Sequence, residues 1–327
     1  MTAAARNGTP RWPGNGQFAL TIMDDTDRAT VAQSRPLYDA LIHYGLRTTK
    51  TIWPLPTDRG DPYWGEDLTH DEHRAWLHRL LGEGFEISFH GARSGGSPRE
   101  VTHAALERFR EEFGEYPATF ANHASNAECL YWGQRRFDVP AYRAIYRSLR
   151  TGPTTFYGDR EESPYYWADL CRGTIRYVRN FTFAGIATSA IDRFMPYHDP
   201  RRPFVRAWFS ASEGGDVEEF VALLSDRNVD RLRESGEASI VYTHSAKGFV
   251  RDGRLDPRVE RILSRLASTG GWFVPVRTLL ERLEEVRGVR DISPLQHAEL
   301  ESRWILDHAG KGFHSVKRRF ARRSGRP

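Results

Sequence analysis

Short strand-like runs alternate with helix-like segments along most of this 327-residue chain. The clearest strand-like runs are residues 17–23, 47–53, 85–89, 118–120 and 238–243. Helical periodicity falls between them over residues 30–44, 70–81 and 99–113. Such alternation is typical of a largely parallel sheet, because each helix carries the chain back to the end at which the next strand begins. The chain is therefore expected to be an α/β protein, folded as one large barrel or as two smaller domains.

The middle of the chain, roughly residues 124–235, is less regular. We expect helices near 128–135 and 141–149 there, and strands near 174–179 and 204–209. Alternation returns afterwards, with a helix over 257–268, a short strand over 272–274, a helix over 276–287 and an amphipathic segment over 294–308. The same architecture is therefore expected to extend over almost the whole chain.

Polar, metal-ligating residues stand where the strand-like runs end. They are Asp24 and Asp25 after the first run, His90 after residues 85–89, Asn122 and His123 after 118–120, and His244 after 238–243. In α/β barrels and open α/β sheets, the loops at the carboxyl ends of the strands gather side chains from several strands into one site. Two carboxylates and several imidazoles gathered in this way suggest a divalent metal site with a spare carboxylate for proton transfer. An imidazole at a strand end, such as that of His244, can serve as a general acid.

Each of these features also has a purely structural interpretation. Two consecutive carboxylates cannot both face the same way on a strand, so one could bind a cation while the other acts as a base, but Asp25-Thr26-Asp27 could equally begin a helix. His90 could be a buried, hydrogen-bonded core residue. The aromatic run Tyr165-Tyr166-Trp167 could stack on a sugar or pack in the core. The glycine-rich loop at 91–98 lacks the form of a phosphate-binding loop, so nucleotide binding is not expected there.

The positive charge of the chain is concentrated at its C-terminal end. The chain has 47 Lys and Arg residues against 43 Asp and Glu residues, and seven of the basic residues but none of the acidic ones lie in 311–327. Residues 1–310 therefore carry 40 basic against 43 acidic residues. Because a nucleic-acid enzyme carries its positive charge around its site, no nucleic-acid partner is expected. The basic tail is expected to be a disordered solubilising end, or a peripheral contact for an anionic membrane or an acidic partner.

The sequence shows no sign of export. Residues 1–16 are polar, contain Gly and Pro, and hold no apolar signal-peptide core. No apolar stretch approaches the roughly 20 residues that a membrane span requires. Cys129 and Cys171 lack the spacing of a redox or metal motif and are expected to be free, partly buried thiols. A cytoplasmic location is the default expectation, with peripheral membrane contact through the tail as an addition to it.

Taken in order, the strand-end residues resemble the polysaccharide deacetylase family, the NodB-type group of carbohydrate esterase family 4. Thr21-Ile22-Met23-Asp24-Asp25-Thr26 resembles the family's first motif, Thr-Phe-Asp-Asp-Gly. Glu86-Ile87-Ser88-Phe89-His90 resembles its second motif, and Val241-Tyr242-Thr243-His244 resembles its last. The resemblance covers roughly residues 17–285 and implies an irregular (β/α)7 TIM-like barrel. The chain would then divide into a flexible N-terminus (1–16), the barrel (17–290), and a C-terminal helix with the basic tail (291–327).

The resemblance also implies a role for each motif residue. It makes Asp24 the catalytic base, Asp25 and His90 metal ligands, and His244 the general acid. The family's second metal-binding His is replaced by Ser94 in this chain, and the family's orienting Arg has no counterpart in residues 121–124. We therefore expect His123, from the adjacent strand end, to be the third ligand of a divalent metal, with Zn²⁺ as the expected ion.

The function implied is a metal-dependent hydrolase that removes an N-acetyl or other acyl group from an amino sugar or a sugar-containing cell-surface precursor. The candidate substrate contacts are Asn122, Arg93, Tyr242, Lys247 and Trp167. One alternative is a non-catalytic carbohydrate-binding barrel whose metal site is degraded at Ser94. A second alternative is a metal-independent hydrolase or lyase that uses Asp24 and His244.

Overall fold

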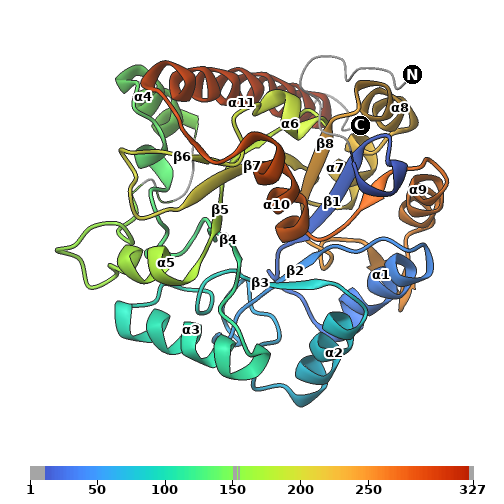
Figure 1. The fold of residues 1–327 in the computed structure, drawn as a ribbon, viewed down its shortest axis with the longest axis horizontal. Helices are drawn as coiled ribbons and strands as arrows, with labels where there is room; N and C mark the ends of the chain where they lie inside the picture. The colour runs from blue at the N-terminus through green and yellow to red at the C-terminus, as the bar shows by residue number, and fades with distance from the viewer. Residues whose placement is uncertain (1–11, 150–152, 154, 324–327) are drawn as a thin grey trace.

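The computed structural model describes residues 12–149, 153 and 155–323 of the chain. Within these residues, seven parallel strands close into a barrel (Figure 1). They are β1 (Ala19–Asp24), β2 (Thr49–Ile52), β3 (Glu86–Phe89), β4 (Thr119–Ala121), β5 (Tyr177–Phe183), β7 (Ala207–Glu213) and β8 (Ala238–Thr243). Each strand pairs with the next in this order, and β8 pairs again with β1. This closed barrel confirms the fold class expected from the sequence.

The barrel strands are buried on both faces, which explains their composition. Every residue of β1 to β4 is buried, and parallel strands covered on both sides read as nearly continuous apolar or β-branched runs. One buried carboxylate lies at the amino end of β3. Glu86 accepts hydrogen bonds from the hydroxyls of Thr49 at 2.6 Å and Thr119 at 2.8 Å, and from the backbone N–H of Arg277 at 3.0 Å. These bonds attach helix α10 (Val276–Arg287) across this end of the barrel and leave the opposite end for a site (Figure 1).

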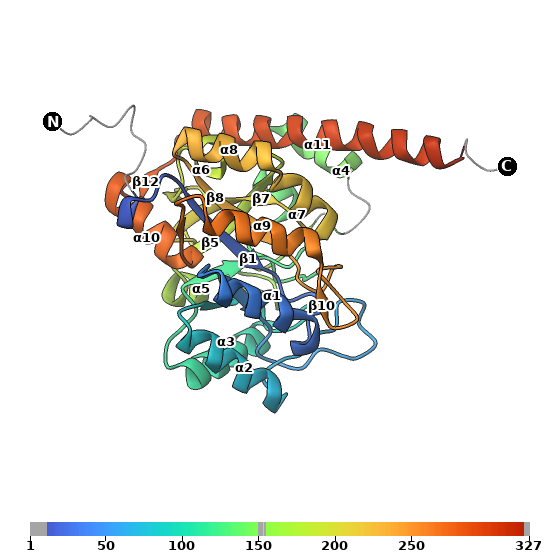
Figure 2. The ribbon, with the colours of Figure 1, turned by 90° about the vertical axis from the view of Figure 1, so that its right-hand side faces the viewer.

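Helices surround the barrel on its outside (Figures 1 and 2). The remaining helical elements are η1 (Pro13–Asn15), α1 (Val31–His43), α2 (Asp71–Gly82), α3 (Arg99–Phe113), η2 (Gly133–Arg136), α4 (Pro140–Leu149), α5 (Ala168–Thr174), α6 (Thr188–Ile191), α7 (Val217–Leu223), α8 (Asp226–Ser235), α9 (Pro257–Ala267) and α11 (Pro294–Arg323). The short strands are β6 (Tyr197–His198), β9 (Val250–Arg251), β10 (Arg254–Leu255), β11 (Trp272–Phe273) and β12 (Arg290–Asp291). In the part of the chain that the structure describes, no helix is both long and apolar enough to cross a membrane.

The long helix α11 runs along one side of the molecule beside α4 and extends past the barrel (Figure 2). The amphipathic segment expected at 294–308 is the first half of this helix, which continues through much of the basic tail as far as Arg323. The side chains of the basic tail, and with them the expected membrane contact, lie outside the described residues.

The N-terminal segment is packed where the structure describes it. Trp12 is buried, stacks on Trp272 at 5.8 Å between ring centroids, and donates its indole N–H to the carbonyl of Gly236 at 2.8 Å. Residues 1–11 of the expected flexible N-terminus lie outside the described residues. Cys129 and Cys171 are free thiols, as expected, and both are fully buried.

The sequence-based prediction is partly confirmed in the middle of the chain, where the helix expected at 141–149 is α4. The strands expected at 174–179 and 204–209 begin about three residues later, as β5 and β7. The helix expected at 128–135 is absent, and only the short turn η2 forms there. Tyr131 (φ +46°) and Gly133 (φ +63°) adopt backbone angles that an α-helix cannot contain. This irregular segment matters because it forms one wall of the candidate site.

Candidate active site

The end of β1 and the loop after it carry three carboxylates, Asp24, Asp25 and Asp27, that divide between two faces. Side chains alternate along an extended chain, so residues two apart share a face and neighbours do not. Asp25 and Asp27 line a cavity of about 530 Å³ at the carboxyl end of the barrel, whereas Asp24 is not among its lining residues. The alternation thus places two of the three carboxylates in the cavity.

Asp24 lies in a buried ion pair outside the cavity. Its Oδ2 is 3.1 Å from Nζ of Lys50, and both side chains are almost fully buried. Ser245 donates to the same carboxylate from its backbone N–H at 2.7 Å and from its hydroxyl at 2.8 Å, and the hydroxyl of Tyr38 donates at 3.2 Å. The structure therefore places the expected catalytic base where it ties β1 to Lys50 and to the loop after β8, away from the cavity.

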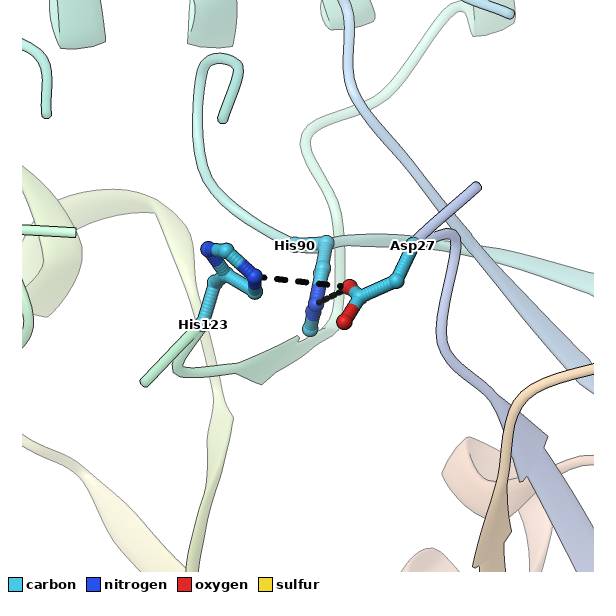
Figure 3. A group of neighbouring side chains, drawn as sticks. All are labelled: Asp27, His90 and His123. Carbon is cyan, nitrogen blue, oxygen red and sulfur yellow. Dashed lines mark hydrogen bonds and ion pairs between the residues drawn. The ribbon is translucent and has the colours of Figure 1, made fainter. Parts of the chain in front are cut away.

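Asp27 meets two histidines from neighbouring strand ends (Figure 3). Its Oδ1 is 3.1 Å from Nε2 of His90, which follows β3, and 3.6 Å from Nε2 of His123, which follows β4. One ligand atom from each of the three residues lies within 4.8 Å of the others, and all three residues are buried. The structure thus brings His90 and His123 together as expected, but the carboxylate between them is Asp27, whereas Asp25 Oδ2 is 3.9 Å from His90.

The orientation of the His123 ring is fixed from behind. Its Nδ1–H donates to Oδ1 of Asn126 at 3.0 Å, so Nε2 is the ring nitrogen that faces Asp27. The Asn126 amide is itself held, because its Nδ2 donates to the carbonyl of Arg93 at 2.7 Å and to Glu128 at 2.9 Å. A histidine that ligates a metal is commonly oriented by such a partner on its other nitrogen.

Burial and charge act differently on the three groups. Burial alone would raise the pKa of Asp27, but hydrogen bonds with His123, His244 and His90 hold that pKa well below its ordinary value. Burial lowers the pKa of His90 against the attraction of Asp25 and Asp27. Burial alone would also lower the pKa of His123, but hydrogen bonding to Asp27 and Asn126 raises it. Asp27 is therefore ionised and His90 neutral near pH 7, the forms in which these groups bind cations.

Asp25 forms a separate ion pair with Arg179 of β5. The two guanidinium nitrogens lie 3.0 and 2.6 Å from the two carboxylate oxygens, and both side chains are buried. The guanidinium also lies over the Tyr242 ring, 4.5 Å from its centroid. Burial alone would raise the pKa of Asp25, but the charge of Arg179, with smaller contributions from His90 and His244, holds it below its ordinary value. Asp25 is thus an ionised carboxylate facing the cavity.

His244 and Lys247 approach Asp27 from the loop after β8. The Nδ1–H of His244 donates to the carbonyl of Gly215 at 2.7 Å, so its Nε2 points at Oδ2 of Asp27, 3.2 Å away. Nζ of Lys247 is 3.7 Å from the same oxygen. The two oxygens of Asp27 therefore face different groups, with His90 and His123 on one side and His244 and Lys247 on the other.

Three of the five expected substrate contacts line the cavity, namely Asn122, Tyr242 and Lys247. Arg93 and Trp167 do not line it. Trp167 is fully buried and packs against Phe89 and Phe120 at 6.1 and 5.2 Å between ring centroids. Its position is that of a core residue, which is the structural alternative for this aromatic run.

The cavity also contains residues that the sequence did not single out. They are chiefly Asp27, Arg179, Tyr63, Trp132, Arg136, Trp304 and His308. Asp27 had a usable signal, since it stands two residues from Asp25 and shares its face. Arg179 sits within a strand rather than at its end, and Trp304 and His308 come from α11 at the far end of the sequence, so a search of strand ends could not find them.

Comparison with known proteins bears on the fold. No protein-family model and no curated protein matches the chain. Among solved structures, the chain is similar to Puue allantoinase, with 15% identity, a TM-score of 0.53, and coverage of 88% of this chain and 99% of that one. It is also similar to a protein provisionally assigned as a polysaccharide deacetylase from Mycobacterium smegmatis, with 11% identity, a TM-score of 0.51, and coverage of 88% and 98%. At these identities the likeness establishes the barrel fold over most of the chain.

Proposed function

We propose that this protein is a metal-dependent hydrolase that removes an acyl group, N-acetyl in the simplest case, from a nitrogen of a sugar or sugar-linked small molecule. The observation that carries the proposal is that one cavity holds both a set of cation ligands and a separate ionised carboxylate. Asp27, His90 and His123 form a set of cation ligands, while Asp25 is held ionised by Arg179 beside them. A ligand set next to a spare carboxylate is what metal-assisted hydrolysis requires.

The ligand set fits Zn²⁺ or a similar divalent ion. One carboxylate and two imidazoles are the protein ligands of many catalytic zinc sites, which leave a further position open. The bond from His123 to Asn126 directs Nε2 of His123 towards Asp27. The depressed pKa of Asp27 keeps its carboxylate ionised. A bound cation would supply Lewis acidity, polarising a carbonyl group and making water a nucleophile at neutral pH.

Asp25 is the proposed general base, in place of Asp24. It lies in the cavity and is ionised, whereas the carboxylate of Asp24 is occupied by Lys50, Ser245 and Tyr38. Arg179 orients Asp25 through two hydrogen bonds and holds its pKa below the ordinary value, so Asp25 is ionised, the form in which a carboxylate can accept a proton. The proposal likewise assigns the ligand carboxylate to Asp27 in place of Asp25.

His244 is the proposed general acid. Because its Nδ1–H is bonded to Gly215, the nitrogen that exchanges a proton with substrate is Nε2, which faces the cavity. Oδ2 of Asp27 lies 3.2 Å from that nitrogen and helps to hold the ring in this orientation. His244 can then protonate the amine that leaves when the amide bond breaks.

The proposed substrate class follows from the size and walls of the cavity. About 530 Å³ suits a small molecule of one or two sugar units. Tyr63, Trp132 and Trp304 supply aromatic rings on the wall, and a sugar ring can pack its C–H groups against such surfaces. N-Acetylglucosamine and its nucleotide-linked form are the first candidates, and allantoin joins the screen because a protein of similar fold is named for its action on that compound.

The test is acetate release from the N-acetylated sugars and loss of the intact ring of allantoin by chromatography, using protein treated with EDTA and then reloaded with Zn²⁺. We expect turnover of at least one N-acetylated sugar, loss of turnover on chelation, and recovery with zinc. The D25N variant should lose roughly 10²- to 10⁴-fold in kcat, the usual contribution of a general base. The D24N variant, folded as judged by circular dichroism, should retain far more activity than D25N.

Three outcomes would count against the proposal. Turnover that survives EDTA would favour a metal-independent hydrolase. A folded protein with neither bound ion nor turnover would favour a non-catalytic binding barrel. Loss of activity in folded D24N but not in D25N would show that the base is Asp24.

A further inference from the structure

A second cavity, of about 380 Å³, is lined mainly by arginine. It lies between η2, the first turn of α4, residues 155–160 and the turn after β6. The arginines that line it are Arg135, Arg143, Arg160, Arg201 and Arg202. Among the described residues, its one lining carboxylate is Asp138. Because neighbouring guanidinium charges repel one another, the positive charge that Asp138 does not balance needs a partner.

Three of the arginines are fixed by carboxylates of the protein. Nε of Arg135 donates to Asp159 at 2.6 Å, and Nε of Arg201 donates to Asp199 at 2.9 Å. Arg202 is almost fully buried, pairs with Asp199, and contacts Asp138 at 3.0 Å. These pairs build a rigid wall and balance three of the five charges.

Arg143 and Arg160 complete the cavity without such partners. In the described part of the chain, neither makes an ion pair with a carboxylate. Nε of Arg143 donates to the carbonyl of Phe137 at 2.6 Å, which leaves its two terminal nitrogens available. Nε of Arg160 is buried and has no hydrogen-bond partner among the described groups. A buried donor without a partner is uncommon in native proteins and points to a bound water or ion.

We propose that this arginine pocket binds a phosphate group, either free or carried by a small molecule such as a nucleoside diphosphate. Two guanidinium charges remain after Asp138, Asp159 and Asp199 are counted, which matches the charge of a phosphate dianion. Guanidinium groups bind phosphate oxygens through paired, charge-assisted hydrogen bonds. The pocket is a single cavity of small-molecule size rather than an extended basic stripe, so a small phosphorylated ligand fits it better than a nucleic acid does.

The pocket shares a wall with the candidate active site. The turn η2 contributes Gln134 and Arg135 to the arginine pocket, while Arg136 of the same turn and the preceding Trp132 line the larger cavity. The phosphate site is nevertheless separate in its residues, since the two cavities have no lining residue in common. Its existence does not depend on the proposed hydrolysis.

The test is isothermal titration calorimetry at low ionic strength, with inorganic phosphate and UDP as the two probes. We expect saturable binding with one site per chain, and the tighter of the two probes identifies the ligand as free or carried phosphate. R143Q and R160Q should each weaken binding about 10-fold or more, because each removes charge-assisted hydrogen bonds. R147Q, on the exposed surface of the same helix α4, removes the same charge and should change affinity by less than about 2-fold, as is usual for an exposed charge outside a site.

The active-site variant D27N separates this pocket from the larger cavity and should leave phosphate affinity unchanged. Failure of both probes to bind the wild type would overturn the proposal. So would an equal loss in R147Q, which would indicate a general charge effect. A loss of binding in D27N but not in R143Q or R160Q would place the phosphate in the larger cavity and would also overturn it. Circular dichroism verifies that each variant is folded.

Discussion

Two groups of side chains in this protein combine carboxylates with imidazoles at similar spacing. Asp27, His90 and His123 lie at the carboxyl end of the barrel, and Asp138, His297 and Glu301 lie where α11 meets the start of α4. In each group, one ligand atom per residue lies within 4.8 Å of the others. Distance alone would make both of them candidate metal sites.

The groups differ in what their lone pairs already bind. The backbone N–H groups of Asp138 and Val139 donate to the two oxygens of Glu301, the second at 3.1 Å. Arg201 and Arg202 hold the oxygens of Asp138, and His297 is fully buried against both acids. In the barrel group, by contrast, the described partners of Asp27 are side chains that line one cavity, namely His90, His123, His244 and Lys247.

The comparison teaches that neighbouring ligands become a metal site only where backbone N–H groups do not already hold them and a cavity gives access to them. The barrel group meets both conditions, and we infer that it is the cation site. The Asp138, His297 and Glu301 group instead fastens α11 to the barrel. The predictions that follow are ordered by the size of the expected effect.

The largest effect concerns zinc affinity. D27A should lose more than about 100-fold in zinc affinity, because loss of a direct ligand exceeds the roughly 10- to 100-fold penalty of losing an outer partner. E301A should retain wild-type affinity, because Glu301 belongs to the other group. Competition titration with a chromophoric chelator measures both. Equal losses in the two variants would erase the distinction between the groups.

The second effect concerns stability. E301A leaves two backbone N–H groups without their acceptor and removes one of the two carboxylates that face His297, so it should lower the free energy of unfolding by about 2–4 kcal/mol. The matched control is E299A on the same helix, whose ion pairs with Arg193 and Arg303 are partly exposed and should contribute less than about 1 kcal/mol. Urea unfolding measures both variants. A similar value for the two would mean that the buried group does not fasten α11.

A smaller effect tests the partner of His123. N126A removes the acceptor that orients the ring, and zinc affinity should fall by about 10- to 100-fold. The same chelator competition measures it. The control is N228A on α8, whose half-buried amide donates to the carbonyls of Ala222 and Leu223 and does not line the cavity. Unchanged affinity in N126A would show that the His123 ring does not depend on this bond.

The smallest effect is a pH dependence of stability at the α11 group. Burial alone would lower the pKa of His297, but hydrogen bonds to Asp138 and Glu301 raise it above the ordinary value. A raised folded-state pKa stabilises the protein fully below the unfolded pKa of about 6.5, and this contribution is lost as pH rises through the folded pKa. The stability difference between wild type and H297Q should therefore shrink as pH rises from 6 to 9. Urea unfolding at several pH values measures it, and a difference that grows with pH would contradict the assignment.

Much of the fold was predictable from the sequence because its barrel strands are short apolar runs followed by polar residues. The predictions for β8, α3 and α10 agree with the observed bounds. The prediction for residues 128–135 is wrong because helical periodicity there is overridden by positive φ at Tyr131 and Gly133 and by packing in the wall of the cavity. Local pattern does not report such tertiary constraints.

The site was predictable as a set of strand ends but not in its detail. His90, His123 and His244 do converge on the cavity. The alternation of side chains could have placed Asp25 with Asp27 rather than with Asp24. The ion pair of Asp25 with Arg179 could not be predicted from the sequence, because it joins residues 154 positions apart that only the folded barrel brings together.

The most direct test of the central claim is an anomalous difference map at the zinc edge, from a crystal grown with Zn²⁺. The account predicts one strong peak within bonding distance of Asp27, His90 and His123, and none beside His297 and Glu301. A peak at the α11 group, or a zinc-saturated crystal with no peak at Asp27, would contradict it.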